Sequence, residues 1–146
     1  MSEAFEVPES DLKMIMDTPH LQALGVEFVS AGSARGALRI PWREDLVGDP
    51  DTDVIAGGVV TALLDHVGGL AIRAAEREGF MVATLDLRID YVRPAAPRAG
   101  VTAEAHCYKI TRTAVFVRAH AWDVDPEDPI ATSQTVFVRS KPGRRS

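Results

Sequence analysis

Apolar residues recur with helical spacing along residues 57–78, which predicts one long helix with a single buried face. A shorter amphipathic helix is predicted over residues 10–24, where Pro19 breaks or kinks it. Gly79 is the expected C-cap of the long helix, because glycine adopts the left-handed backbone without strain. The apolar stripe of the long helix comprises Val60, Leu63, Leu64, Val67, Leu70, Ala71 and Ala74.

Most of the other segments alternate apolar and polar residues with a period of two, which predicts strands. These strands cover residues 25–30, 34–41, 82–92, 101–110, 113–123 and 130–139. In the third of them, one face carries Leu85, Leu87, Ile89 and Tyr91, and the other carries Thr84, Asp86, Arg88 and Asp90. The last connections are too short for parallel crossovers, so the sheet should be antiparallel. The predicted fold class is α+β, with a curved antiparallel sheet wrapped around one long central helix.

Length and composition narrow the class of protein. The 146 residues suit one domain over residues 1–146, with residues 1–8 and 141–146 flexible. A net charge of -5 argues against a nucleic-acid partner. The N-terminus lacks a signal-peptide pattern, and no run approaches the roughly 18 apolar residues of a membrane span. We therefore expect a cytoplasmic protein with no membrane partner.

Cysteine and histidine add little chemistry to this picture. Cys107 is the only cysteine, and it lies within an alternating segment, so we expect a small core residue. His20, His106 and His120 show no metal-ligand spacing with acids or cysteine, so no metal site is predicted. His66 follows Asp65 directly but lies about 100° further around the helix, so packing or capping is favoured over a dyad with Asp65.

Candidate chemistry is concentrated in the long helix, which contains Gly57, Gly58, Asp65, Gly68 and Gly69. Each interior glycine costs a helix roughly 1 kcal/mol, and such departures fall at functional or closely packed sites. The first N–H groups of a helix have no intrahelical acceptor, and the helix dipole favours negative charge there. Gly57 and Gly58 therefore form a candidate oxyanion site. Asp65 is a candidate general base or nucleophile. A solvated acid and packing glycines explain the pattern equally well.

Spacing separates these candidates. Gly57 and Asp65 are eight residues apart, which corresponds to about 12 Å along a helix. One carbonyl cannot contact both on the same chain. Two antiparallel helices related by a two-fold axis would bring Gly57 of one chain to Asp65 of the other, so joint action requires at least a dimer. Thr61 and Gly69 lie one turn before and after Asp65 on the same narrow face.

Two segments resemble a known family. Residues 57–65, followed by Gly68 and Gly69, resemble the signature of the hot-dog-fold acyl-CoA thioesterases, most closely the phenylacetate-degradation (PaaI-like) type. Residues 85–95 resemble the strand that follows the central helix in this family, with its Tyr-x-x-Pro ending. The resemblance covers roughly residues 20–140. It implies a hydrolase that releases free acid and coenzyme A from an acyl-CoA, with no other cofactor and no metal.

The resemblance also implies roles for particular residues. Asp65 matches the catalytic carboxylate, and the N–H of Gly57 matches the group that polarises the thioester carbonyl. Thr84 aligns with a hydroxyl that helps to place water or substrate. Gly58, Thr61 and Arg93 are further substrate-binding candidates. Arg93 would either lie near the coenzyme A phosphates or be a solvated surface residue. Arg88 and Arg98 are less favoured candidates for the same phosphates. The implied assembly is a homodimer, and homotetramers of two such dimers are common in the family. Candidates for lining the acyl pocket are Val59, Leu63, Phe80 and Met81.

Two departures from the family pattern support an alternative. Ala56 occupies the position where relatives usually carry histidine, and the Pro50 region replaces an asparagine or glutamine. Both changes would suit a non-catalytic acyl-CoA binding or sensing module. A dehydratase or hydratase on the same fold would need a histidine with a partner acid, which Asp65 and His66 match poorly. The sequence leaves the acyl group open.

Overall fold

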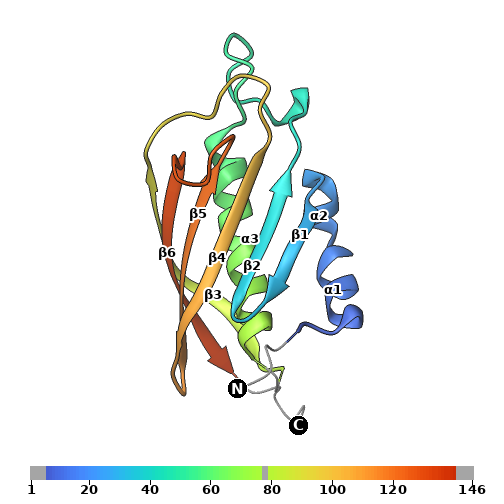
Figure 1. Ribbon diagram of the computed structural model, residues 1–146, viewed down its shortest axis with the longest axis vertical. Coiled ribbons are helices and arrows are strands. Elements are labelled where there is room, and N and C mark those ends of the chain that lie inside the picture. Colours follow the sequence, from blue (N-terminus) through green and yellow to red (C-terminus); the bar gives the residue numbers. More distant parts are fainter. Residues whose placement is uncertain (1–5, 77–78, 141–146) are drawn as a thin grey trace.

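One long helix lies in the concave face of a curved sheet (Figure 1). The structure is a computed structural model and describes residues 6–76 and 79–140. The helix is α3 (Gly57–Ala75), and the antiparallel sheet has the order β1-β2-β4-β5-β6-β3. The α+β architecture predicted from the sequence is confirmed. The strands are β1 (Glu27–Gly32), β2 (Arg35–Ile40), β3 (Met81–Tyr91), β4 (Val101–Ile110), β5 (Ala114–Trp122) and β6 (Ala131–Ser140).

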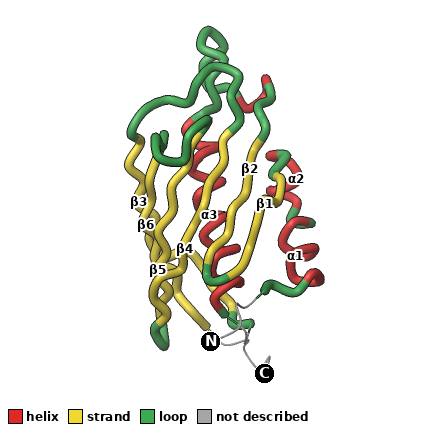
Figure 2. Tube along the Cα trace, in the orientation of Figure 1, coloured by secondary structure: helices red, strands yellow, loops and turns green. Residues whose placement is uncertain are grey.

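The predicted N-terminal helix is divided in two, as Pro19 indicated. α1 (Glu9–Met16) ends before this proline, and α2 (Pro19–Leu24) begins with it, at a position where a missing N–H costs nothing. Leu21 of α2 is buried, and the apolar side of α1 is half-buried against the core. Both helices lie beside the sheet on the side of β1 (Figure 2). A short 3-10 helix, η1 (Glu44–Leu46), follows β2.

Small inward-facing side chains let α3 lie close to the sheet. The inward positions of β4, β5 and β6 are buried and include many alanines. At Gly36 of β2, an added Cβ would lie 2.8 Å from Leu70 Cγ and 3.2 Å from the backbone nitrogen of Ala71. At Gly68 of α3, an added Cβ would lie 3.2 Å from Phe137 Cζ. Gly36 and Gly68 are therefore packing glycines. At Gly58 and Gly69 an added Cβ would meet nothing within 4 Å.

A β-bulge in β3 changes which face Thr84 occupies. Thr84 pairs with Phe137 and Asp86 with Val136, so Leu85 is left opposite no residue. Phe137 is buried against α3, so Thr84 also faces the helix, together with Leu87 and Ile89 on the other side of the bulge. The predicted alternation, which placed Thr84 opposite Leu85 and Leu87, is therefore wrong at this point. The bulged Leu85 is 65% exposed.

Other expectations need correction at the ends of elements. The C-cap of α3 is Glu76 in an extended conformation, so Gly79 does not cap the helix, although its φ of 68° is left-handed. Val7 is buried and Pro8 is the N-cap of α1, so these two residues are not the loose end that was predicted. Glu6 is exposed, and the other residues of the predicted flexible ends, 1–5 and 141–146, lie outside the described residues. Cys107 is buried as expected, and burial raises the pKa of its thiol to about 11.

The prediction that no segment is apolar enough to span a membrane is wrong for α3. It is long and apolar enough to cross a membrane by length and composition alone. Half of this stretch is buried inside the protein, which is typical of the core helix of a globular domain.

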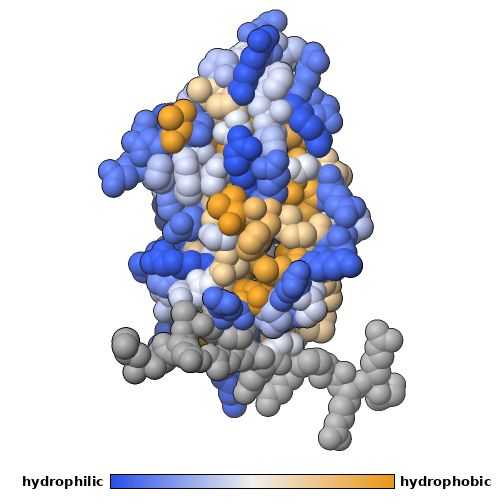
Figure 3. Space-filling model, turned by 45° about the vertical axis from the view of Figure 1, so that its right-hand side comes forward, coloured by the Kyte–Doolittle hydropathy of each residue, from blue (hydrophilic) through white to orange (hydrophobic). Residues whose placement is uncertain are grey.

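Apolar surface is also exposed on the edge strand. Large exposed hydrophobic residues on or directly after β3 are Met81, Leu85, Tyr91 and Val92. Hydrophobic side chains also gather between charged ones on the face in Figure 3. Apolar surface that is contiguous and ringed by polar groups is typical of an interaction site.

We expect leucine to have opposite effects at two adjacent glycines of α3. Gly68→Leu should lower the free energy of unfolding by about 1–3 kcal/mol, because the side chain would overpack against Phe137. Gly69→Leu should leave it unchanged or raise it by up to about 1 kcal/mol, because the position is open and leucine is the better helix former. Urea denaturation of the two variants measures the difference, and equal losses of stability would contradict it.

Candidate active site

The N-terminus of α3 presents backbone N–H groups that no side chain caps. The N-cap is Ala56, with φ -59° and ψ 142°, and it makes no side-chain hydrogen bond to the first turn. Gly57 and Gly58, the first two residues of the helix, have N–H groups without an intrahelical acceptor. Because nothing lies within 4 Å of an added Cβ at Gly58, a ligand can approach this turn closely.

A cavity of about 540 Å³ opens at this helix end. Its walls are the loop before α3, the first turn of α3, the end of β3 and the segment after β3. Most of its lining is apolar, and the side chains with polar groups are Asp49, Thr52, Tyr91 and Arg93. The lining residues are Gly48, Asp49, Thr52, Val54, Ile55, Ala56, Gly57, Val60, Tyr91, Val92, Arg93, Pro94, Ala95 and Ile130.

Tyr91 fastens the first turn of α3 to the end of β3. Its hydroxyl donates to the carbonyl oxygen of Gly57 at 3.1 Å, and Thr61 Oγ1 donates to the same oxygen at 3.1 Å. Each hydroxyl has one proton, so a hydrogen bond between the two hydroxyls, which are also close enough to form one, replaces one of these two. The sequence pattern places Tyr91 on one face of its strand and in the Tyr-x-x-Pro ending, and it predicts no role for this residue in the site. Thr61, a predicted substrate-binding residue, thus bonds to the start of the helix.

Asp65 lies at a second, smaller cavity of about 340 Å³. Thr84 Oγ1 donates a hydrogen bond to Asp65 Oδ1 at 2.8 Å, which the bulge at Leu85 makes possible. No other described side chain donates to this carboxylate, so its second oxygen can accept from a ligand. The cavity is lined by Ile15, Thr18, Leu21, Asp65, His66, Gly69, Leu70, Arg73, Val82, Ala83, Thr84 and Phe137.

The structure brings together some predicted residues and separates others. Asp65 and Thr84 are hydrogen-bonded, whereas Gly57 and Asp65 line different cavities of the same chain. The expected separation of about 12 Å along the helix explains this division. The predicted lining residues Val59, Leu63, Phe80 and Met81 line neither cavity, because Leu63 and Phe80 belong to the core and Met81 is exposed.

His66 is hydrogen-bonded to His20 of α2. His20 Nδ1 and His66 Nε2 are 2.8 Å apart, with the donor set by the tautomers. Burial is the main cause that lowers the pKa of His66, and the nearby His20 lowers it further against the opposing effect of Asp65. The expectation that His66 packs instead of forming a dyad with Asp65 agrees with this geometry.

Arg93 has anionic partners within its own chain. Its guanidinium donates to Asp123 at 2.8 and 3.1 Å, and to Asp128 at 3.3 Å. The hydrogen bond from Arg93 is the main cause that holds the pKa of Asp123 below its ordinary value, and the side chain of Asp123 is only 3% exposed. Arg98 is likewise paired with Asp53 at 3.0 Å. A phosphate would therefore have to compete with carboxylates already in place.

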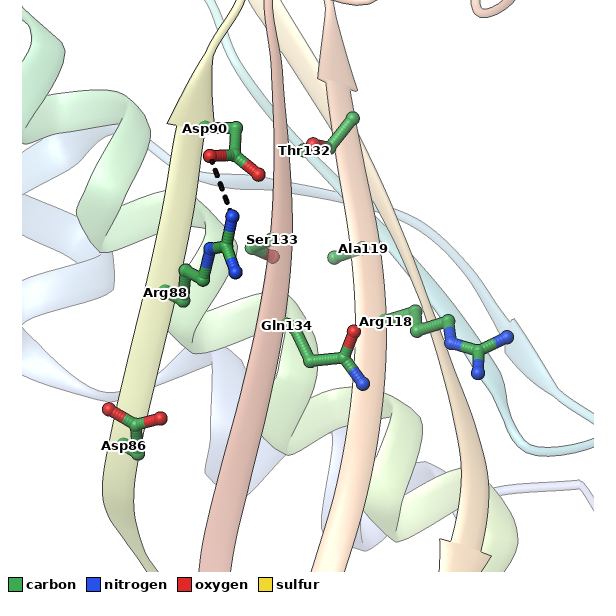
Figure 4. A pocket seen from close by; sticks show the side chains of 8 residues that line it. All are labelled: Asp86, Arg88, Asp90, Arg118, Ala119, Thr132, Ser133 and Gln134. Atoms are coloured by element: carbon green, nitrogen blue, oxygen red, sulfur yellow. Dashed lines mark ion pairs between the residues drawn. The ribbon is translucent and has the colours of Figure 1, made fainter.

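A third cavity, of about 530 Å³, lies on the opposite face of the sheet (Figure 4). Arg88 of β3 is directed toward Asp90 of the same strand and forms an ion pair at 3.5 Å. Apart from Arg88, a less favoured candidate for the coenzyme A phosphates, none of the predicted catalytic or substrate-binding residues lines this cavity. Among residues 6–76 and 79–140, no group of three or more histidine, cysteine, aspartate or glutamate side chains could hold a metal ion.

Comparison with known proteins gives consistent results. The sequence model of the thioesterase superfamily matches residues 53–130. The chain is similar to a presumed esterase of Halobacterium salinarum, with 33% identity over 117 residues that cover 74% of this chain and 76% of the relative. It is also similar to a Pseudomonas aeruginosa protein of known structure, with 34% identity, a TM-score of 0.79, and coverage of 88% of this chain and 95% of that chain.

Two more distant structures share the fold. A Haemophilus influenzae thioesterase superposes with a TM-score of 0.81 at 20% identity, covering 94% of each chain. A point mutant of the phenylacetic acid degradation protein PaaI of Thermus thermophilus superposes with a TM-score of 0.72 at 23% identity, covering 84% of this chain and all of that one. These similarities confirm the predicted hot-dog fold and the predicted family resemblance.

The lowered pKa of His66 predicts that the protein loses stability in mild acid. The folded state resists protonation of His66, while the unfolded chain takes up a proton near the ordinary pKa of 6.5. The contribution is therefore fully present above about pH 6.5 and is lost as the pH falls below it. Thermal unfolding from pH 8 to pH 5 should show a smaller loss of Tm for His66→Gln than for the unmodified protein. Equal slopes would contradict the prediction.

Proposed function

The chain belongs to the thioesterase superfamily, and from this premise we propose that it hydrolyses an acyl-CoA thioester to a free acid and coenzyme A. Family membership supports the hydrolysis of thioesters or esters in general. The proposal of acyl-CoA hydrolysis rests on the two cavities. One contains a helix N-terminus that no side chain caps, and the other contains a carboxylate that accepts a hydrogen bond from a hydroxyl.

The thioester carbonyl would accept a hydrogen bond from the N–H of Gly57, with Gly58 beside it. Negative charge develops on this oxygen when the carbonyl carbon is attacked, and the positive end of the α3 dipole stabilises it. No side chain competes for the N–H groups, because Ala56 does not cap the helix. The hydrogen bonds from Tyr91 and Thr61 to the Gly57 carbonyl would keep this first turn in place.

Asp65 would act on the carbonyl carbon from the other side. With Oδ1 accepting from Thr84, its second oxygen is available to take a proton from water, and the resulting hydroxide attacks the carbonyl. Alternatively, that oxygen attacks the carbonyl directly and water hydrolyses the mixed anhydride. In either route the tetrahedral intermediate collapses with loss of the coenzyme A thiolate. Neither route requires a metal or a cofactor beyond the coenzyme A of the substrate.

Cooperation between Gly57 and Asp65 requires two copies of the chain. β3 is an edge strand of 11 residues that pairs only with β6, so its outer N–H and C=O groups are available to another strand. Antiparallel pairing of two β3 strands across a two-fold axis would also cover part of the exposed apolar surface at Leu85 and Tyr91. This homodimer is part of the proposal, and its further assembly into a tetramer stays a prediction.

A non-catalytic acyl-CoA binding module is the second candidate, and it is favoured by Ala56. Its methyl side chain can donate no hydrogen bond to a carbonyl at the helix N-terminus. Binding of acyl-CoA without release of free thiol would support this candidate over hydrolysis.

Removal of the Asp65 carboxylate tests the hydrolytic proposal. Asp65→Asn should lower kcat by about 10²–10⁴-fold for every acyl-CoA that the protein hydrolyses, because the amide can neither take the proton nor attack. The measurement is thiol release with a thiol-trapping reagent. The control is Asp86→Asn, which changes a carboxylate on the opposite face of β3 and should leave the rate within about two-fold. Unchanged hydrolysis by Asp65→Asn would falsify the mechanism.

Mixing two inactive variants tests whether the site is shared between chains. Gly57→Pro removes the N–H and should fit the backbone, because proline is favoured at the first helical position and Ala56 already has the extended backbone that precedes a proline. An added Cβ at this position would lie 3.6 Å from Tyr91 Cε1, an ordinary van der Waals contact. Alone, it should lower kcat by about 10²–10³-fold. After unfolding and refolding with Asp65→Asn in equal amounts, each mixed dimer should regain one intact site, giving about a quarter of full activity. No recovery, in mixed dimers verified by tag capture, would contradict the shared site.

A further inference from the structure

We propose that the cavity beside Asp65 holds the acyl group of the substrate, and that the N-terminal helices α1 and α2 form the wall that limits its size. The inference rests on the proposed function. The observation behind it is that Ile15, Thr18 and Leu21, from a segment far from the helix signature in sequence, line the same cavity as Asp65 and Thr84.

The cavity is bounded on three sides by different parts of the fold. α3 contributes Asp65, Gly69 and Leu70, and the sheet contributes Phe137 and a short stretch of β3 ending at Thr84. The third side is α1 and α2. The carbonyl carbon attacked by or through Asp65 must lie at this carboxylate, so one of the two groups attached to that carbon extends into the space next to it. We assign the acyl group to this space.

The wall is short and is held to α3 by two polar contacts. α1 has eight residues and α2 six, which is too short for stability in isolation, so these helices depend on packing. The His20–His66 hydrogen bond ties α2 to α3. An ion pair between Asp11 and Arg73, both about three-quarters buried, ties α1 to α3. Leu21, 1% exposed, anchors the wall from the inside.

The lining indicates the chemistry of the occupant. Half of the lining residues are aliphatic or aromatic, which favours an apolar acyl group. Among the lining residues that the structure describes, Arg73 is the one cation, and it is already neutralised by Asp11. Asp65 would repel a second carboxylate, so dicarboxylic acyl groups are disfavoured. A volume of about 340 Å³ is near the lower end of ligand cavities, roughly 300–1,000 Å³. The structure therefore favours an uncharged aromatic or short-to-medium-chain acyl group over a long chain.

The larger cavity at Gly57 suits the coenzyme A part of the substrate. Its rim carries Asp49, Thr52 and the backbone of the loop before α3, which can hydrogen-bond to the amides of the coenzyme A arm. The reverse assignment, with the acyl group at Gly57 and the coenzyme A arm at Asp65, is a distinct arrangement that the experiment below separates from ours.

The experiment compares the acyl preference of the intact protein with variants that narrow or widen the Asp65 cavity. Gly69→Leu adds a side chain where an added Cβ meets no atom within 4 Å. Ile15→Ala removes bulk from the opposite wall. Val92→Phe narrows the Gly57 cavity at a residue that is 61% exposed. Thiol release is measured with acetyl-, hexanoyl-, phenylacetyl-, succinyl- and palmitoyl-CoA, and urea denaturation and gel filtration establish that each variant is folded with unchanged assembly.

We expect the intact protein to prefer hexanoyl- or phenylacetyl-CoA over succinyl- and palmitoyl-CoA. Gly69→Leu should lower kcat/KM for the preferred substrate relative to acetyl-CoA by roughly ten-fold or more, the discrimination typical of one or more methylene groups. Ile15→Ala should shift the preference toward larger acyl groups. The double variant Ile15→Ala/Gly69→Leu should return the preference toward that of the intact protein.

Three outcomes would overturn the inference. An unchanged preference in Gly69→Leu, with hydrolysis retained, would remove the cavity assignment and leave the proposed function standing. A preference moved by Val92→Phe and not by Gly69→Leu would place the acyl group at Gly57. Failure of the intact protein to hydrolyse any substrate of the panel would overturn the proposed function, and this inference with it.

Discussion

The close packing of α3 against the sheet is the constraint on which the rest of the structure depends. At Gly36 and Gly68 the helix and the strands approach so closely that a methyl group on either residue would press against its neighbours. This contact fixes the rotation of the helix about its own axis. The apolar stripe then faces inward, and Asp65 and Gly69 are left at the boundary between core and surface, where both line one cavity. Gly36 and Gly68 thus allow close packing, whereas an added Cβ at Gly58 or Gly69 would meet open space.

Hydrophobic periodicity predicted the architecture well, because the period of the pattern reflects which face of an element is buried. The long helix, all six strands and the break at Pro19 agree with the sequence pattern to within a few residues. The pattern failed at Thr84, because a β-bulge inserts one residue and reverses the alternation beyond it. Nothing in the composition of residues 82–92 marks the bulge. The inward direction of Thr84 follows only from its pairing with Phe137.

Contacts between distant segments account for the site features that could not be predicted from the sequence. His20 is 46 residues from His66, and Arg93 is 30 residues from Asp123, so periodicity and local spacing contain no information about either pair. Arg93 illustrates the consequence: a basic residue at a motif strand suggested phosphate binding, whereas its guanidinium contacts two carboxylates. In contrast, the separation of Gly57 from Asp65 was predictable, because helix geometry alone fixes the rise per residue.

Ala56 packs closely against the loop before α3. Gly48 approaches Ala56 so closely that an added Cβ on Gly48 would lie 3.2 Å from Ala56 Cβ, and Ala56 N donates to Leu46 O at 2.9 Å. The loop between them is closed by its own hydrogen bonds, from Asp51 N and Thr52 Oγ1 to Asp49. A larger side chain at position 56 would compete with Gly48 for this space. In the proposed mechanism, the backbone N–H groups of α3 therefore polarise the carbonyl without help from an imidazole at position 56. Catalysis then depends more strongly on the dipole of this helix and on the hydrogen bond from Tyr91 to Gly57, which holds the first turn in place.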